Sequence, residues 1–276
     1  MKISKISKIE NKNFKLESSL LFDGILVGLV AGIVGASYRL LISYSEKLVH
    51  YIADFIKNGF VYIGILFKRE PMASGSGIPQ VSAEVTGRLN SNPLRILIYK
   101  IIGGLTASLG GLSLGREGPS IQLGAMSGKL VSRILKRDNI KEKYLITCGA
   151  SAGLSIAFGA PLAGVLFSIE EVHKQIVICC FSAAVIANIV GQYIFGLTAI
   201  FKFPEIPYVE VSIYPWVVLL GILLGIFGTF YNVTIKILFK IYEYFKLNIV
   251  FRPQVAFLIS FVLFICYPIV LGSGHS

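Results

Sequence analysis

Long apolar runs alternate with short polar interruptions along this chain, and the alternation predicts its elements. A helix needs about 20 apolar residues to cross a bilayer. Runs that approach or exceed this length cover residues 20–43, 48–67, 176–200, 216–242 and 254–270. The apolar stretches 96–114 and 144–158 are shorter or end at glycine and proline. This pattern predicts an all-α, polytopic membrane protein with broken, re-entrant helices.

The helices are interrupted at residues 73–79, 115–119 and 159–161 by small residues, glycine and proline. Backbone without helical hydrogen bonds is tolerated at membrane depth only where it lines a cavity or is buried in protein. Short hydrophobic segments broken by glycine and proline are typical of transporter binding sites near the bilayer midplane. The three breaks therefore indicate a transport site.

Composition supports a membrane protein and excludes an ordinary soluble domain. The chain of 276 residues is 54% hydrophobic and 15% charged, with a mean hydropathy of +0.73, whereas soluble domains carry about 25% charged residues. Its net charge is +11, and basic residues gather in an N-terminal arm, 1–19, and in a basic loop, 133–143. Such clusters can bind nucleic acid, but beside lipid-soluble segments they indicate the cytoplasmic face. We expect a multi-pass protein of the cell membrane with a cytoplasmic N-terminus and no nucleic-acid partner.

Small residues within the apolar runs indicate packing. Glycines recur every three or four residues along the first run and leave one helix face bare, so another helix can approach closely. These glycines are Gly24, Gly28, Gly32 and Gly35. The cysteines lie in apolar runs without metal-ligand spacing, and we expect them to pack as small apolar residues. They are Cys148, Cys179, Cys180 and Cys266. The sequence predicts no metal or cofactor.

The first break contains Gly75-Ser76-Gly77-Ile78-Pro79. The glycines free backbone N–H groups, Ser76 offers a hydroxyl, and Pro79 suits the first turn of a following helix. A dehydrated anion needs neutral, fixed donors of this kind, because a fully charged pocket would hold it too tightly for turnover. The alternative is an ordinary interhelical turn. A phosphate loop is disfavoured, since no Lys-Ser/Thr pair follows at the required spacing.

The second break, Gly115-Arg116-Glu117-Gly118-Pro119, places two charged residues at membrane depth. Each costs about 2.5–3.5 kcal/mol on insertion scales and rarely lies there without a function. We expect a helix to begin at Ser120, with its free N–H groups facing the break as an anion site. Glu117 would occupy this site as a carboxylate and vacate it when protonated, which makes it a candidate gate and proton carrier. The alternative is a structural Arg116–Glu117 ion pair.

The third break, Gly-Ala-Pro at 159–161, precedes an apolar helix that ends in Glu170 and Glu171. Small residues and a proline permit tight packing at such a break. One of the two carboxylates would face the interior and accept protons. The alternative is a solvated helix end beside His173 and Lys174.

The order and spacing of these motifs resemble the CLC family of chloride channels and chloride/proton exchangers. The matching segments are Gly75–Pro79, Gly115–Pro119 and Phe158–Glu171, and the likeness extends over nearly the whole chain from about residue 20. The resemblance implies two inverted halves per subunit and a homodimer with one pathway in each subunit. Residues 162–200 would supply part of the dimer face.

The resemblance also implies roles for individual residues. Ser76 would coordinate the central chloride, Glu117 would be the external gating glutamate, and Glu171 would be the internal proton-transfer glutamate. Exchangers carry an acid at the last position, whereas channels commonly have an apolar residue there. We therefore expect voltage- or pH-sensitive chloride/proton antiport, with a passive chloride channel as the alternative. The implied chloride-binding residues are Gly75, Ser76, Gly77, Ile78, Pro79, Gly115, Arg116, Gly118 and Pro119.

The chain departs from the family in its second half. Family members complete the chloride site with a Gly-x-Phe-x-Pro loop and a tyrosine, and we find neither here. We expect residues 20–276 to be the first inverted repeat without the second: a fragment, a truncated product or one half of a split protein. In such a chain the chloride site would lack donors, and Glu117 and Glu171 would lack the facing wall that excludes water from the pathway. A non-transporting assembly subunit is the alternative of another class. An enzyme is disfavoured, because no Ser/His or Cys/His pairing accompanies the acids.

Overall fold

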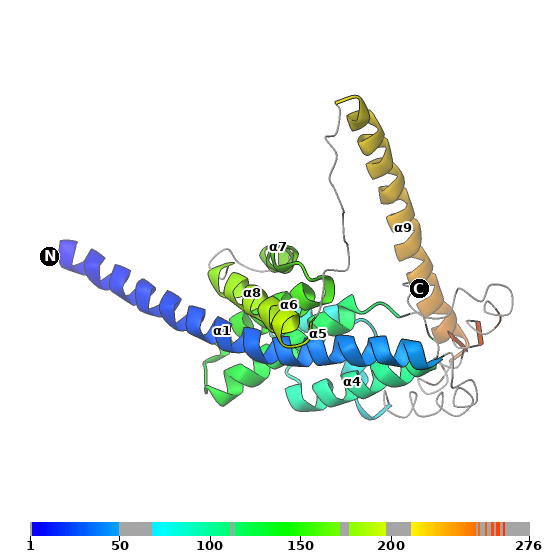
Figure 1. Ribbon diagram of the computed structural model, residues 1–276, viewed down its shortest axis with the longest axis horizontal. Coiled ribbons are helices and arrows are strands. Elements are labelled where there is room, and N and C mark those ends of the chain that lie inside the picture. The colour runs from blue at the N-terminus through cyan, green and yellow to red at the C-terminus, as the bar shows by residue number, and fades with distance from the viewer. Residues whose placement is uncertain are drawn as a thin grey trace.

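The computed structural model describes most of the chain as helices (Figure 1). The described residues are 2–49, 68–110, 112, 114–171, 177–196, 211–246, 248, 252, 255, 256, 258, 259 and 262. The main elements are α1 (Lys2–Val49), η1 (Pro71–Ala73), α3 (Ile78–Val85), α4 (Pro93–Leu109), α5 (Glu117–Ile134), α6 (Asn139–Phe158), α7 (Pro161–Glu171), α8 (Val177–Tyr193), η3 (Val211–Ile213) and α9 (Tyr214–Tyr244). No strand occurs among the described residues, in agreement with the all-α prediction.

Two stretches are long and apolar enough to cross a membrane, judged by length and composition: Ser18–Glu46 within α1 and Val211–Tyr244, which contains α9. Both correspond to predicted runs. Helix α1 is longer than predicted, because no proline or glycine precedes Gly24 to end it. The N-terminal arm therefore continues the first helix. The predicted run 48–67 lies outside the described residues from position 50 onward, as does most of 254–270.

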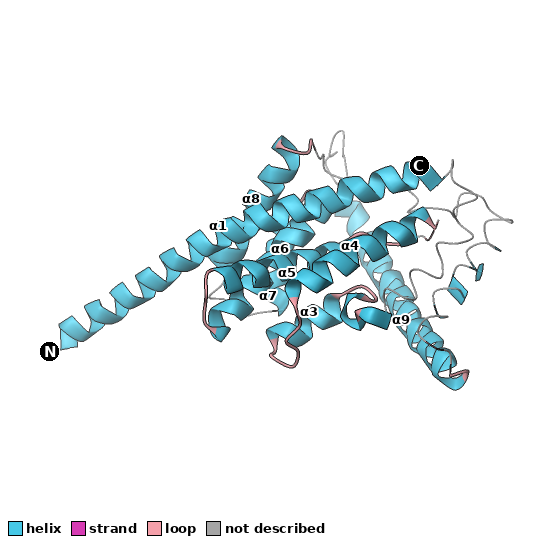
Figure 2. Cartoon of the chain, turned by 90° about the horizontal axis from the view of Figure 1, so that it is seen from below, coloured by secondary structure: helices cyan, strands magenta, loops and turns pink. Residues whose placement is uncertain are grey.

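The glycine stripe of α1 packs against α8, as the sequence predicted. A Cβ on Gly28 would come within 2.7 Å of the Ala183 carbonyl oxygen, and one on Gly32 would come within 2.9 Å of the Val190 side chain. Gly35, the last of the stripe, faces Ile156 of α6 at 3.4 Å. The bare face therefore allows α1 to lie across both helices, as Figure 2 shows.

Helices α5 and α6 form the centre of the bundle. Gly124 and Gly128 of α5 face Gly149 and Gly153 of α6 so closely that a Cβ on any of them would overlap the opposing backbone. The buried cysteines pack on the other side of α6, where the Sγ atoms of Cys148 and Cys179 lie 2.6 Å apart. The burial of Cys148, Cys179 and Cys180 agrees with the predicted packing role, and Cys266 lies outside the described residues.

The basic stretch 133–143 is mostly helical, and the prediction of a loop there was wrong. Only residues 135–138 connect α5 to α6. Asp138 caps α6, because its side chain accepts a hydrogen bond from the Lys141 backbone N–H at 2.8 Å. Arg137 in this connection pairs with Asp23 of α1 at 2.7 Å, and the hydrogen bond to Asp23 raises the pKa of Arg137.

Helix α9 extends away from the bundle (Figure 1). Its large apolar side chains are exposed along its whole length. Gly221, Gly225 and Gly228 lie on it, and a Cβ on any of them would meet no atom within 4 Å among the described residues. The residues between α8 and η3, from 197 to 210, lie outside the described part of the chain.

Candidate functional site

The first motif forms the connection between η1 and α3. Gly75 and Gly77 have φ angles of 68° and 94°, in the left-handed region that favours glycine. A Cβ on Gly77 would collide with the Gln122 side chain at 2.6 Å. Pro79 lies in the first turn of α3, as predicted. The motif is therefore a tight, well-supported turn with Ser76 at its centre.

A buried lysine supports this turn from α4. Lys100 is 4% exposed, and its Nζ donates to the carbonyl oxygens of Gly75 at 2.7 Å and Ala73 at 3.1 Å. Lys100 was not predicted as a site residue. The available signal was one cation in an otherwise apolar run, which is a functional hypothesis by default in a membrane segment.

The second motif begins α5, and the predicted helix start at Ser120 was three residues too late. The helix begins at Glu117 because the Ser120 backbone N–H already donates to the Arg116 carbonyl at 3.1 Å. The amides of Glu117 and Gly118 precede this first helical bond and belong to the helix N-terminus. An acid in this first turn suits the positive end of the helix dipole. The prediction of an acid at an anion-favouring helix end thus agrees with the structure, with Glu117 inside the helix.

The two motifs meet at Gly118. A Cβ there would lie 2.8 Å from the Ser76 carbonyl oxygen and 2.9 Å from the Ser76 Cβ. Glycine is therefore required for the start of α5 to approach the turn this closely.

Arg116 reaches across to α1. Its guanidinium pairs with the Glu46 carboxylate at 2.5 Å and donates to the Ser43 hydroxyl at 3.3 Å. The sequence alternative was an ion pair with the adjacent Glu117. The structure adds a partner 70 residues away, Glu46, which was not predicted.

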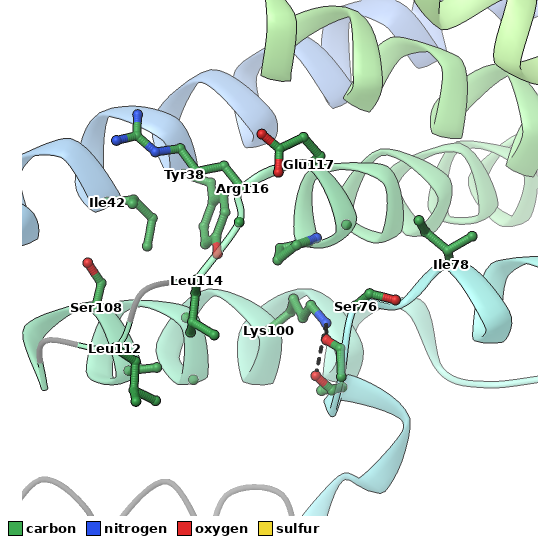
Figure 3. Close-up of a pocket in the computed structure, with 18 of the residues that line it drawn as sticks. Tyr38, Ile42, Ser76, Ile78, Lys100, Ser108, Leu112, Leu114, Arg116 and Glu117 are labelled. Carbon is green, nitrogen blue, oxygen red and sulfur yellow. Dashed lines mark hydrogen bonds between the residues drawn. The ribbon is translucent and has the colours of Figure 1, made fainter. Parts of the chain in front are cut away.

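These elements enclose a cavity of about 620 Å³. Tyr38, Ile42 and Glu46 line it from successive turns of α1. Figure 3 shows α1 along one side and α4 along the other, with the beginning of α5 and the Ser76 turn at one end. The predicted site residues that line it are Gly75, Ser76, Ile78, Gly115, Arg116, Glu117, Gly118 and Pro119. Gly77 and Pro79, from the same motif, are not among the residues that line it.

The third motif lies away from this cavity. Gly159 ends α6 in the left-handed conformation, with φ of 68°, and Pro161 begins α7. Gly164 then packs against α6, where a Cβ would come within 3.2 Å of the Ser155 backbone nitrogen. Helix α7 ends at Glu171, but the side chain of this predicted proton-transfer residue lies outside the described residues.

The cavity combines an apolar lining with a few charged groups. Lys100 and Arg116 contribute positive charge, and Glu46 and Glu117 contribute negative charge. Neutral donors are present as the Ser76 and Tyr38 hydroxyls and the first amides of α5. Such a site can hold a small anion, and the Glu117 carboxylate can compete with that anion for the helix N-terminus.

Known proteins are similar to this chain over most of its length. Residues 59–276 match the family described as voltage-gated chloride channels. The H(+)/Cl(-) exchange transporter ClcA of Vibrio cholerae serotype O1 is 33% identical over 264 residues, covering 85% of this chain and 55% of that protein. This chain thus spans about half the length of the curated relatives it matches.

Solved structures show the same fold. A slow cyanobacterial Cl−/H+ antiporter superposes with a TM-score of 0.75 at 30% identity, covering 87% of this chain and 61% of the other. A CLC-type fluoride/proton antiporter superposes with a TM-score of 0.80 at 20% identity, covering 92% and 66%, and shows the fold alone. Together with the family match over most of its residues, this likeness shows that the chain belongs to the voltage-gated chloride channel family.

Proposed function

We propose that this chain contributes a chloride pathway that exchanges chloride for protons across a membrane, with Glu117 as its gate. The observation that carries the proposal is the shared cavity of Ser76 and Glu117, held together by the close approach of Gly118 to Ser76. The functions of the relatives, H(+)/Cl(-) exchange and Cl−/H+ antiport, support exchange over a passive channel.

The proposed chemistry uses a competition at the N-terminus of α5. The ionised Glu117 carboxylate occupies the amide-rich end of the helix, where negative charge is favoured. Protonation removes that charge, and chloride then takes its place with the Ser76 hydroxyl as a further donor. In this proposal the ligand is chloride, no cofactor is needed and no covalent chemistry occurs. The other residues of the two motifs, Gly75–Pro79 and Gly115–Pro119, shape the chloride site.

Glu171 remains the proposed internal proton acceptor. It is the last residue of α7, and its position at the end of an apolar helix supports a role at the edge of the membrane interior. Neutralising it in a transporting protein would stop proton movement and preserve chloride movement. Loss of both movements together would count against this role.

We further propose that the pathway is completed by a second half, in a multi-pass, homodimeric assembly with a cytoplasmic N-terminus. The coverage of about half of each curated relative supports this. The exposed, glycine-bearing α9 also supports it, since an apolar helix of this length needs a lipid or protein partner. Residues 162–200 are proposed to supply part of the dimer face.

Proteoliposomes containing the 276-residue chain test this function. Chloride efflux would be recorded together with external pH, beside protein-free liposomes. Efflux that drives protons inward against their gradient supports exchange, whereas efflux without proton movement supports a channel.

The half-length coverage also favours a second candidate, a non-transporting assembly subunit. Absence of flux from folded, inserted protein would support this candidate. It would then alter transport by a co-expressed full-length relative.

A further inference from the structure

Glu46 is an acid of α1 that belongs to neither anion motif and yet lines the cavity. It lies near the end of the helix, two turns beyond Tyr38, and pairs with Arg116 at 2.5 Å. The two side chains are only 20% and 12% exposed. A charge pair so shielded from water acts on its surroundings more strongly than a solvated surface pair.

The charged groups facing Glu117 come from three elements. Helix α1 contributes Glu46 and the titratable Tyr38, α4 contributes Lys100, and Arg116 precedes Glu117 in the chain. The Ser76 turn contributes no charged side chain. Arg39, also on α1, is near Arg116 but donates to the Ile156 carbonyl of α6 at 3.0 Å.

The charges that line the cavity cancel when Glu117 is ionised, because two acids then face two cations. When Glu117 is protonated, the lining carries one net positive charge, which a single chloride neutralises. Without the Glu46 charge, the lining would already be positive with Glu117 ionised. Chloride would then be attracted without a proton.

We propose that Glu46 is the counter-ion that links chloride binding to protonation of Glu117, by cancelling the charge of Arg116. The inference rests on the proposed function and adds a residue that sets its proton coupling. Glu46 is a positioning residue, since it acts through Arg116 and the field in the cavity.

Chloride binding to the purified full chain in detergent tests this role. Isothermal titration with sodium chloride, against a sodium gluconate reference, would be run at pH 8 and pH 5. Repeating it in buffers of different ionisation enthalpy gives the protons taken up per chloride. The variants are Glu46→Gln, Arg116→Gln and the double variant. Glu142→Gln is the matched control, because Glu142 pairs with Arg133 at 3.8 Å away from the cavity.

For the wild-type chain we expect chloride to bind about tenfold more tightly at pH 5 than at pH 8, with proton uptake. Glu46→Gln should lower the Kd at pH 8 about tenfold and reduce proton uptake. The chloride Kd and proton uptake of the double variant should return towards the wild-type values, since the double variant restores the charge balance. If the pair were merely structural, the chloride Kd and proton uptake of the double variant would be no closer to wild type than those of Glu46→Gln.

Two results would overturn the proposal, and they are distinguishable. Proton-linked chloride binding that is the same in wild type and folded Glu46→Gln would remove the role of Glu46 and leave the proposed function intact. Absence of proton-linked chloride binding in the folded wild-type chain would overturn both. If Glu46→Gln does not fold, the double variant Glu46→Ala/Arg116→Ala can be compared with Arg116→Ala alone. This comparison tests the same charge balance.

Discussion

Gly118 lies so close to Ser76 that a Cβ on the glycine would come within 2.8 Å of the serine carbonyl oxygen. This contact joins the beginning of α5 to the turn before α3. It brings a hydroxyl donor and the gating carboxylate candidate Glu117 to one cavity. The geometry of the site therefore depends on the absence of one methyl group.

Gly118→Ala should separate the two motifs. The added methyl group must displace backbone, and overpacking of this kind costs about 1–3 kcal/mol. We expect a lower melting temperature in detergent and chloride affinity at least about tenfold weaker, since a shift of about 1.4 kcal/mol in binding is tenfold. Gly221→Ala is the control, because nothing lies within 4 Å of that position. Equal chloride affinity in both variants would show that the contact is unimportant for the site.

Glu117→Gln should make chloride binding independent of pH. The amide cannot ionise, so it neither competes with chloride at the helix N-terminus nor takes up a proton. Titration calorimetry between pH 5 and pH 8 should give one chloride Kd for the variant. The wild-type Kd should rise with pH. A pH dependence that survives the substitution would place the titrating group elsewhere.

Lys100→Met should destabilise the Ser76 turn. The substitution removes the donor to the buried Ala73 carbonyl oxygen and to the part-buried Gly75 carbonyl oxygen, and a buried oxygen left without a partner costs about 1–3 kcal/mol. Thermal unfolding in detergent should occur at a lower temperature than for wild type. Arg95→Met is the matched control, since Arg95 is an exposed cation on the same helix. Similar melting temperatures for the two variants would contradict the supporting role of Lys100.

Lys129→Met should destabilise the bundle more strongly than Gly118→Ala. Lys129 is fully buried and pairs with Glu84, which also accepts hydrogen bonds from the backbone N–H and hydroxyl of Ser91. Breaking a buried pair from one side costs about 3–5 kcal/mol, because the remaining charge is uncompensated.

Adding Glu84→Gln should recover much of that loss in the free energy of unfolding. The measurement is the unfolding equilibrium of the single and double variants in mixed detergent. A double variant less stable than Lys129→Met would show that Glu84 acts through Ser91 and not through Lys129.

Most helices could be predicted from the sequence, since apolar runs and glycine or proline breaks are local signals. The predicted helix boundaries were less accurate where a capping residue sets the first residue of the helix. Asp138 starts α6 inside the predicted basic loop, and α5 begins at Glu117 because Arg116 already accepts its first bond. The motif residues Ser76 and Glu117 were predicted as site residues, and both line the cavity.

Local sequence is enough to predict the helical membrane character, the positions of the breaks and the motifs on which the proposed anion site rests. These properties depend on composition and on neighbouring residues. Three contacts arise only when the helices pack: Gly118 meets Ser76, Lys100 supports the turn, and Glu46 pairs with Arg116 across 70 residues. Those contacts depend on how α1, α4 and α5 pack together. No pattern within one helix specifies which distant side chain will face it.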